Sequence, residues 1–363
     1  MSLSSGGLEF HAVNLSKWMK ERGRDITLII SENSGIKDGI VAHSLPYVEI
    51  KKPAKYYDLP KAKKISAYIM KNNIEVVICG DNNDLNFVSL VRMFCGDKIK
   101  LIYIQQMQIG INKKDLLHNI THSRIDYWIT PLEYLKKQAL EKTNIREEKI
   151  RIVRYGTEIE KFSEMKDKIQ ARQLLNIPEN KFVIGILGRI DRLKGQDFLI
   201  ESVHYIKEKH NLDLYLIIAG NPTKNEGEGF MNELKDRVHK YKLEQNISFT
   251  GRINESADFY SAIDLFAMAS QSESYGLVTI EAMLSGVPVI GTNTGGTPEL
   301  LNYGEYGVIY KPGDIEDFAG KVIEIYYNYE IYLEKSGIAR ENAKNEYSHR
   351  SECENLEKII FEN

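Results

Sequence analysis

The segment that decides the fold is KFVIGILGRIDRLKGQDFLIESVHYIKEKHNLDLYLIIAG, residues 181–220. Its two ends, 181–188 and 213–220, are short and almost continuously apolar, which is typical of strands buried on both faces of a sheet. Between them, apolar side chains recur at a helical period over about 196–210. A helix between two such strands predicts an α/β fold with a parallel sheet covered on both faces.

The same alternation extends in both directions from this segment. Toward the C-terminus, a helix is predicted near 229–242, and apolar strands are predicted at 246–251, 264–269 and 287–292. Toward the N-terminus, strands are predicted at 25–30, 74–80, 98–104, 126–130 and 149–153, separated by helices near 8–23, 60–73, 83–95, 113–124 and from Pro131. Two doubly wound domains therefore follow each other in the chain.

The segment RYGTEIEKF (154–162) separates the two series. It is polar, contains a glycine and has no clear period, so we place the domain boundary there, with a first domain over 1–155 and a second over 156–343. Ligands of open α/β sheets bind at the carboxyl ends of the strands. Two such domains in tandem predict a cleft that holds two substrates face to face.

The first domain begins unusually. A doubly wound domain normally starts with an apolar strand, whereas this chain starts at the glycine turn SSGG (4–7). We expect the first, usually central, strand to be missing, with reduced stability and doubtful activity as the consequence. The start MSLSSGGLEF has neither a basic end nor a long apolar stretch, so no signal peptide is expected.

Composition excludes several classes of protein. The 363 residues are 42% hydrophobic and 27% charged, with 48 Lys and Arg against 51 Asp and Glu, so a uniformly basic nucleic-acid binder is excluded. No apolar run approaches the ~20 residues of a membrane span. Cys79, Cys95 and Cys353 have no framework or zinc-site spacing, which favours a reducing cytoplasm.

The two halves differ in charge. Residues 1–155 carry 25 Lys and Arg against 17 Asp and Glu, and the remainder carries 23 against 34. Within the basic half, seven lysines alternate with tyrosines and apolar residues over 51–71. This pattern fits either a solvated helix face or a helix lying on an anionic surface.

Two segments of the second domain carry candidate chemistry. In GRIDRLKG (188–195), Arg189 and Lys194 stand between a strand and the start of a helix, where a fork of donors, a point charge and free amides suit a diphosphate. A structural salt bridge is the alternative. In SESYGLVTIEAMLSGVPVI, Glu273 lies in a loop and Glu281 eight residues later in a helix, and a carboxylate can accept hydrogen bonds from vicinal hydroxyls.

Glycines complete this second region. Gly276 allows the backbone to approach a ligand closely. Farther on, TNTGGTPEL (292–300) places Gly295 and Gly296 between a strand and a helix that begins with proline, which predicts a second turn that cradles an anion. The alternatives are a helix-terminal charge for Glu273 and an exposed helical position for Glu281.

The order GR(x)4KG, Glu(x)7Glu and GTNTGGTPE resembles that of the retaining glycosyltransferases of family 4, which have the GT-B fold of two Rossmann-like domains facing across a cleft. The glycine-loop opening SSGGLEF and the interdomain stretch KIRIVRYGTEIEKF are also similar to the family's. The family usually has Asn-Gly-Val-Asp where this chain has Tyr-Gly-Thr-Glu at 155–158. The resemblance further implies that a C-terminal helix, about 344–363, completes the first domain.

The resemblance implies roles for individual residues. Arg189 and Lys194 would hold the donor diphosphate, Glu273 would contact the hexose and Glu281 the ribose. The remaining donor-side positions implied are backbone contacts at Gly6, Gly7, Gly188, Tyr275, Gly276, Leu277, Gly295 and Gly296. Neither a metal nor a cofactor is implied, and the donor would be a UDP- or GDP-sugar.

The chain departs from the family where many relatives place a donor-facing histidine. Here LIYIQQMQIGINKKDLLHN (101–119) offers Gln105 and Gln106 as neutral hydrogen-bonding groups, and the choice between them stays open. Lys113, Lys114 and the run GDNND (80–84) are candidates for contacts to the acceptor, with plain solvation as the alternative. His118 and His122 have metal-pair spacing, but Asn119 stands where HExxH has Glu, so we expect surface or packing roles.

The expected function is transfer of a sugar from a nucleotide diphosphate to a hydroxyl of a lipid-linked or saccharide acceptor, in bacterial cell-envelope polysaccharide or lipopolysaccharide synthesis. The expected place is the cytoplasm, with peripheral contact to the inner membrane face through the basic half. Alternatives are a sugar-phosphate or sucrose/starch-type synthase with a soluble acceptor, and a catalytically silent nucleotide-sugar-binding subunit. A dehydrogenase is disfavoured, because no GxGxxG follows a strand.

Overall fold

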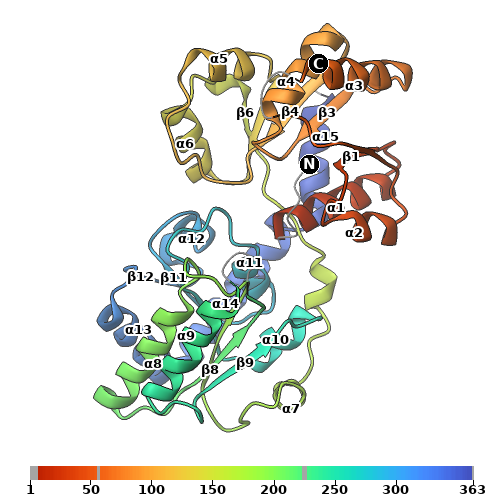
Figure 1. Ribbon diagram of the computed structural model, residues 1–363. Helices are drawn as coiled ribbons and strands as arrows, with labels where there is room; N and C mark the ends of the chain where they lie inside the picture. The colour runs from red at the N-terminus through yellow and green to blue at the C-terminus, as the bar shows by residue number, and fades with distance from the viewer. Residues whose placement is uncertain (1–6, 55–57, 223–226, 362–363) are drawn as a thin grey trace. The chain divides into compact units, whose positions relative to one another are not determined.

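The computed structural model describes residues 7–54, 58–222 and 227–361, and the chain forms two compact units (Figure 1). The N-terminal unit comprises residues up to Gly156 together with residues from His349 onward, and the C-terminal unit spans Thr157–Ser348. The chain therefore crosses between the units twice, at 156/157 and at 348/349. The boundary predicted at 155/156 lies one residue from the first crossing.

The C-terminal unit contains a six-stranded sheet in the order β12-β11-β10-β7-β8-β9, in which every pairing is parallel. Its strands are β7 Val183–Leu187, β8 Tyr215–Ala219, β9 Ile247–Gly251, β10 Leu265–Met268, β11 Val289–Thr292 and β12 Val308–Tyr310. Its helices are α7 Lys168–Leu174, α8 Gln196–His210, α9 Gly227–Lys240, α10 Ser256–Ala262, α11 Leu277–Leu284, α12 Thr297–Leu300, α13 Ile315–Tyr327 and α14 Tyr329–Glu346, with short 3₁₀ turns at Ile159–Phe162 and Asn302–Gly304. The parallel α/β fold predicted from residues 181–220 is confirmed.

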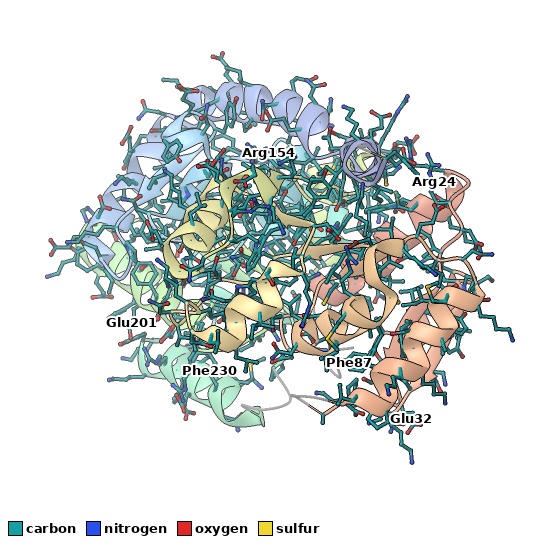
Figure 2. All side chains as sticks on the ribbon, turned by 90° about the horizontal axis from the view of Figure 1, so that it is seen from above. Arg24, Glu32, Phe87, Arg154, Glu201 and Phe230 are labelled. Carbon is teal, nitrogen blue, oxygen red and sulfur yellow. The ribbon has the colours of Figure 1, made fainter. Side chains whose placement is uncertain are left out.

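Both faces of this sheet are covered, which explains why its strands are continuously apolar. On one face, the fully buried Ile184, Leu216 and Ile290 pack against a cluster from α8, α9 and α13 that includes Phe230 (labelled in Figure 2). On the other face, α10 approaches so closely that a Cβ on Gly185 would lie 2.7 Å from the Phe259 ring. Strands β8 and β9 lie on one side of β7, and β10, β11 and β12 lie on the other side. The strand order therefore reverses between β7 and β10.

The N-terminal unit has two parallel sheets, a four-stranded sheet β3-β4-β5-β6 and a two-stranded sheet β1-β2. Their strands are β1 Leu28–Ser31, β2 Tyr47–Ile50, β3 Val76–Cys79, β4 Lys100–Ile104, β5 Tyr127–Thr130 and β6 Ile150–Ile152. The helices are α1 Gly7–Glu21, α2 Lys37–Ala42, α3 Leu59–Lys71, α4 Leu85–Cys95, α5 Leu116–Ser123, α6 Glu133–Lys142 and α15 His349–Phe361, with 3₁₀ turns at Gly96–Lys98 and Glu147–Lys149. The sequence prediction omitted α2 and β2, which have only six and four residues.

The two sheets share one helical layer. Ile29 of β1, Ile50 of β2 and Val77 of β3 all pack against one cluster from α3 and α4 that includes Phe87 (labelled in Figure 2). Among the described residues, β1 and β3 each pair with a strand on one edge only. The strand expected to be missing would belong before α1, and the turn at 4–6, with Gly6, lies outside the described residues.

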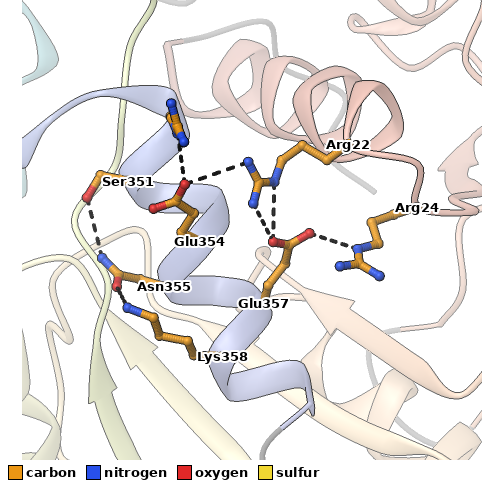
Figure 3. A network of polar contacts seen from close by, with 8 residues as sticks. Arg22, Arg24, Ser351, Glu354, Asn355, Glu357 and Lys358 are labelled. Atoms are coloured by element: carbon orange, nitrogen blue, oxygen red, sulfur yellow. Dashed lines mark hydrogen bonds and ion pairs between the residues drawn. The ribbon is translucent and has the colours of Figure 1, made fainter.

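Helix α15 belongs to the N-terminal unit, although it follows the whole C-terminal unit in the chain. Its Cys353 is buried against Trp18 and Met19 of α1. The helix expected over about 344–363 is interrupted, because α14 ends at Glu346 and the Thr157 N–H donates to the Tyr347 carbonyl before α15 starts. Outside this core, Glu357 accepts hydrogen bonds from Arg22 and Arg24 (Figure 3).

Candidate functional site

The candidate site in the C-terminal unit is formed by three loops at the carboxyl ends of adjacent strands. These loops, 188–195, 269–276 and 293–296, follow β7, β10 and β11, which are neighbours in the sheet. The strand order reverses between β7 and β10. Ligands of open α/β sheets bind at such a reversal.

Glycines hold the three loops close together. Gly195 has a left-handed backbone, with φ of 77°, at the start of α8, and a Cβ there would lie 2.3 Å from the Ala269 carbonyl oxygen. A Cβ on Gly295 would lie 2.1 Å from the carbonyl oxygen of Glu273. Both separations are far below van der Waals contact, so any larger residue would push the loops apart.

An ion pair crosses the reversal. Lys194 Nζ lies 2.6 Å from Glu273 Oε2, and their side chains are 27% and 17% exposed. The backbone N–H of Ser274 donates to the other oxygen of the same carboxylate. Two residues predicted from separate motifs, 79 positions apart in sequence, are thus in direct contact.

Arg189 differs from Lys194 in its freedom. Its side chain is 62% exposed, and the nearest carboxylate, that of Asp191, is 4.0 Å away. The backbone around it is fixed, because the fully buried Gln196 donates from Nε2 to the Arg189 carbonyl. Gly188, Lys194 and Gln196 line a small pocket together with Ser270 and Val278. The long helix α8 starts at this pocket, so its dipole and the Lys194 side chain favour an anion there, and Arg189 directly follows the lining residue Gly188.

Asp191 of this loop and Gln196, the first residue of α8, were not predicted from the sequence. Asp191 accepts from the N–H of Leu193 through its side chain and from the N–H of Lys194 through its carbonyl. An Asp that caps the backbone two residues on is a recognised turn signal, so this role was readable in DRLK. Nothing in the sequence indicates that Gln196 turns back toward Arg189.

Glu281 lies in the second turn of α11 and faces α10. Its Oε2 lies 3.1 Å from the Tyr260 hydroxyl, and burial raises the pKa of the carboxyl to about 7. At the start of the same helix, Tyr275 is fully buried, Gly276 has a left-handed backbone, and Leu277 is the first helical residue. The loop position of Glu273 and the helical position of Glu281 are as predicted.

The turn at 293–296 supports the Glu273 loop. The Gly296 N–H donates to the Glu273 carbonyl at 2.8 Å, and Thr294 Oγ1 donates to the Gln271 carbonyl. The Gly296 amide is therefore already used within the protein, and the anion-cradling role expected of this turn stays a prediction. The following helix, α12, has only four residues.

The predicted acceptor-side residues lie in the N-terminal unit and separate into core and surface. Gln105 is fully buried, its amide oxygen accepts from Trp128 Nε1 at 2.9 Å, and its amide nitrogen donates to the Met107 carbonyl. Both polar atoms are occupied, so Gln105 holds the core together. Gln106 is half-buried beside Gly80, which makes it the better candidate of the pair.

Lys113 and the polar run at 80–84, which were both predicted to face the acceptor, are in contact. Lys113 Nζ donates to Asn82 Oδ1 at 2.7 Å, and burial lowers the pKa of this lysine. Lys114 is exposed. These groups lie after β3 and β4, at the carboxyl ends of neighbouring strands, where a polar ligand would meet them.

The two histidines of α5 do not form a metal pair. His118 is bound to Asp115, and His122 is buried against the Trp128 ring, with centroids 5.1 Å apart. Burial lowers the pKa of His122 to about 4. Among the residues described, no group of three or more His, Cys, Asp or Glu is arranged to hold a metal ion.

No described helix has the length and apolar character needed to span a bilayer.

Solved structures resemble the chain over nearly its full length. A glycosyltransferase from Rickettsia africae ESF-5 aligns with a TM-score of 0.86 at 22% identity, covering 99% of this chain and 96% of that one. Anabaena Alr3699/HepE in complex with UDP and glucose aligns with a TM-score of 0.83 at 19% identity, covering 99% and 97%. These likenesses show the GT-B fold class.

Curated relatives match either about half of this chain or nearly all of it. The lipopolysaccharide core biosynthesis mannosyltransferase LpsB of Rhizobium meliloti is 33% identical over 46% of this chain, and the chain spans 47% of its length. The N-acetyl-alpha-D-glucosaminyl L-malate synthase of Bacillus anthracis is 23% identical over 99% of this chain and 94% of its own. The capsular polysaccharide biosynthesis glycosyltransferase CapM of Staphylococcus aureus is 25% identical over 96% of each.

The chain thus spans about half, or less, of the length of the first such relatives, namely 47%, 37% and 43%. The family model described as glycosyl transferases group 1 matches residues 165–346, which is half of the sequence and includes the three loops, the ion pair and Glu281. The chain belongs to the glycosyl transferases group 1 family.

Proposed function

We propose that this glycosyltransferase transfers a hexose from a nucleotide diphosphate to an acceptor hydroxyl with retention of anomeric configuration. The observation that carries the proposal is the Lys194–Glu273 ion pair at the reversal of the strand order, with the exposed Arg189 beside it. One site thus offers two cations to a diphosphate and a carboxylate to a sugar. The structures of HepE in complex with UDP and with UDP-glucose support a nucleotide-sugar donor.

In this proposal, Arg189 and Lys194 bind the diphosphate and stabilise the charge that grows on it as it leaves. The bond between the anomeric carbon and the phosphate oxygen breaks, and a bond to the acceptor oxygen forms on the same face of the sugar. The acceptor's proton passes to the departing phosphate oxygen, so charge and atoms balance without a covalent intermediate. Glu273 holds the hexose and Glu281 holds the ribose hydroxyls.

The same proposal makes the reaction independent of metal ions, because the two cations supply the charge that the departing diphosphate requires. Activity should then be the same in EDTA and in Mg²⁺. Loss of activity in EDTA that Mg²⁺ restores would contradict this part. The configuration of the product is read from the anomeric proton coupling in its NMR spectrum.

A thermal-shift panel of UDP, GDP and ADP and their common sugar conjugates tests the donor site. A ligand present at 100 times its Kd stabilises the native state by about 2.7 kcal/mol. We expect one conjugate to raise the melting temperature, and Arg189→Ala to remove that shift. Arg192→Ala is the matched control, because Arg192 lies on the same loop but is paired with Glu233 on α9. An equal loss in both variants, or no shift with any conjugate, would contradict the assignment.

For the acceptor, we propose a lipid-linked or saccharide hydroxyl in cell-envelope polysaccharide or lipopolysaccharide synthesis, which the resemblance to LpsB and CapM supports. A soluble acceptor is the second candidate, because the chain is also 31% identical to a mannosylfructose-phosphate synthase over 46% of its length. Transfer from the selected donor to fructose 6-phosphate, compared with transfer to a membrane lipid extract, distinguishes the two. Binding of the donor with neither transfer nor hydrolysis would indicate a silent subunit.

We further propose peripheral contact with the inner face of the membrane through the N-terminal unit. The unit carries 27 Lys and Arg against 21 Asp and Glu. Helix α3 buries Ala62, Ile65 and Ile69, and its Lys63, Lys64 and Lys71 are exposed. Flotation with anionic and with neutral liposomes tests this contact, and equal binding to both would contradict it.

A further inference from the structure

Tyr260 stands between two hydrogen-bond acceptors and can satisfy only one of them. Its hydroxyl oxygen lies 2.9 Å from the Val278 carbonyl oxygen and 3.1 Å from Glu281 Oε2. The residue is 1% exposed, so its hydroxyl cannot form a hydrogen bond with bulk water instead. A phenol has one proton to donate. The hydroxyl therefore donates to Val278 or to Glu281, but not to both fully.

The ring of Tyr260 cannot move to relieve this competition. Phe162, Phe259 and Phe266 surround it in edge-to-face contacts, with centroids 6.2, 5.3 and 5.7 Å away. Only the hydroxyl proton is free to change direction. The protonation state of Glu281 decides which direction is favourable.

Two arrangements of the protons are compatible with these distances. When Glu281 is ionised, Tyr260 donates to the carboxylate. When Glu281 is protonated, its own O–H donates to the Tyr260 oxygen, and Tyr260 donates to the Val278 carbonyl. The groups that face the carboxyl are Tyr260 and Ser256 from α10 and Lys161 from the turn Ile159–Phe162, and each of them lowers its pKa. Burial outweighs them and raises the pKa to about 7, so both forms are populated near neutral pH.

We propose that Tyr260 is a positioning residue that orients the ionised Glu281 carboxylate toward the two ribose hydroxyls of the donor, so that donor binding releases the proton of Glu281. The inference rests on the proposed function, in which Glu281 binds the ribose. A vicinal diol brings two O–H donors, which the two oxygens of an ionised carboxylate can accept. A protonated carboxyl offers fewer acceptor positions and carries a competing proton.

The consequence is a donor affinity that depends on pH. Below about pH 7 the protonated form predominates and competes with binding, whereas above it the carboxylate is ready. A nucleotide sugar is a suitable probe, because its diphosphate is esterified at both ends and has no proton that titrates near neutrality. We expect the Kd of UDP-glucose, or of GDP-mannose if the thermal-shift panel selects it, to be about tenfold weaker at pH 6 than at pH 8.

Tyr260→Phe is the test, read by calorimetry across this pH range. The variant removes a donor from the carboxylate, so the midpoint of the pH profile should move upward and the Kd at pH 7 should weaken severalfold. Tyr310→Phe is the matched control, since among the described residues the buried Tyr310 hydroxyl has no hydrogen-bond partner. It should leave both the midpoint and the Kd unchanged. If Tyr260→Phe does not fold, Ser256→Ala should move the midpoint in the same direction.

The outcomes separate this inference from the function on which it rests. If Glu281→Ala binds the nucleotide sugar as tightly as the wild type, the ribose role of Glu281 is wrong. If Glu281→Ala weakens binding but Tyr260→Phe keeps the wild-type Kd and midpoint, only the positioning role is overturned. A wild-type Kd that does not change between pH 6 and pH 8 would overturn the proton release.

Discussion

Arg189 and Lys194 carry the same charge in the same loop, but their surroundings give them different relations to stability. Lys194 is paired with Glu273 in a partly enclosed contact, whereas Arg189 extends into solvent. Removal of one partner of an enclosed pair leaves the other charge without compensation. Removal of an exposed cation with no close partner costs little. The two residues can therefore be distinguished without any substrate.

We predict that Lys194→Ala lowers the free energy of unfolding by roughly 1 kcal/mol, a figure that allows for the partial exposure of the pair. Arg189→Ala should change it by less than about 0.5 kcal/mol. Urea denaturation followed by far-UV circular dichroism measures both. Equal stability losses in the two variants would show that the ion pair does not hold in solution.

His122 should make the N-terminal unit sensitive to acid. Burial holds its pKa at about 4 in the folded state, whereas the unfolded chain takes up the proton below about pH 6.5. The folded state is then disfavoured as pH falls through this window, by about 2 kcal/mol between pH 7 and pH 5. His122→Phe should remove that part of the loss, and His43→Phe, at an exposed position of the same unit, should not.

Tryptophan fluorescence is the appropriate measurement for this prediction. The chain has two tryptophans, and both Trp18 and Trp128 lie in the N-terminal unit. Their signal therefore reports the unfolding of that unit alone. If the fluorescence midpoints of wild type and His122→Phe fall equally between pH 7 and pH 5, the histidine is not the cause.

At the scale of the elements, the donor-side loops depend on how closely two strand ends approach. A Cβ on Gly220, which follows β8, would lie 1.7 Å from the Gly188 carbonyl oxygen at the end of β7. Gly220 also has φ of 138°, which side chains rarely tolerate. Any substitution must displace Gly188, the residue directly before Arg189.

We predict that Gly220→Ala destabilises the C-terminal unit by at least about 2 kcal/mol and weakens donor binding. Gly320→Ala is the matched control, because a Cβ in that exposed position of α13 meets no atom within 4 Å. As a helix-interior change, it should stabilise by about 0.5–1 kcal/mol. Thermal denaturation by circular dichroism, with and without nucleotide sugar, measures both effects.

The elements also show how far the sequence could be read. Strands such as β7 and β8 were predictable, because both faces are buried and every position is apolar. The pair α2 and β2 was not, because β2 has four residues, none of which is buried, and shows no continuous apolar run. At the site, the contact between Lys194 and Glu273 was not predictable, since it depends on β7 and β10 lying side by side. The position of Tyr260 of α10 beside Glu281 of α11 was likewise not predictable, since it joins two helices that are separate in the sequence and no local pattern indicates it.

At the scale of the whole molecule, the N-terminal unit is held together by a buried carboxylate from the far end of the chain. Glu352 of α15 is 3% exposed, lies 2.9 Å from His11 Nε2 and accepts the N–H of Gly156 at 2.8 Å. It therefore joins α1, the chain leaving the unit and the helix that returns to it. The network around Glu357 in Figure 3 joins α15 at the surface to Arg22 and Arg24 in the turn that follows α1.

We predict that Glu352→Ala lowers the free energy of unfolding of the N-terminal unit by about 2–4 kcal/mol, because it leaves a buried histidine and a buried N–H without an acceptor. Glu357→Ala should cost less than about 1 kcal/mol, since its arginine partners are 32% and 41% exposed. Tryptophan fluorescence during urea denaturation compares the two. A larger loss in Glu357→Ala would reverse the assignment of buried and surface roles.

The position of α15 at the end of the chain also affects how the protein folds during its synthesis. A ribosome makes residues 7–156, then the entire C-terminal unit, and only afterwards the helix that covers Trp18 and supplies Glu352. Domains generally fold in the order in which they leave the ribosome. Here the N-terminal unit emerges first, but it cannot be completed until α15, the last helix, has been made. While almost 200 further residues are translated, the surface of the N-terminal unit that α15 will cover stays exposed. Chaperones bind exposed apolar surfaces of this kind during synthesis.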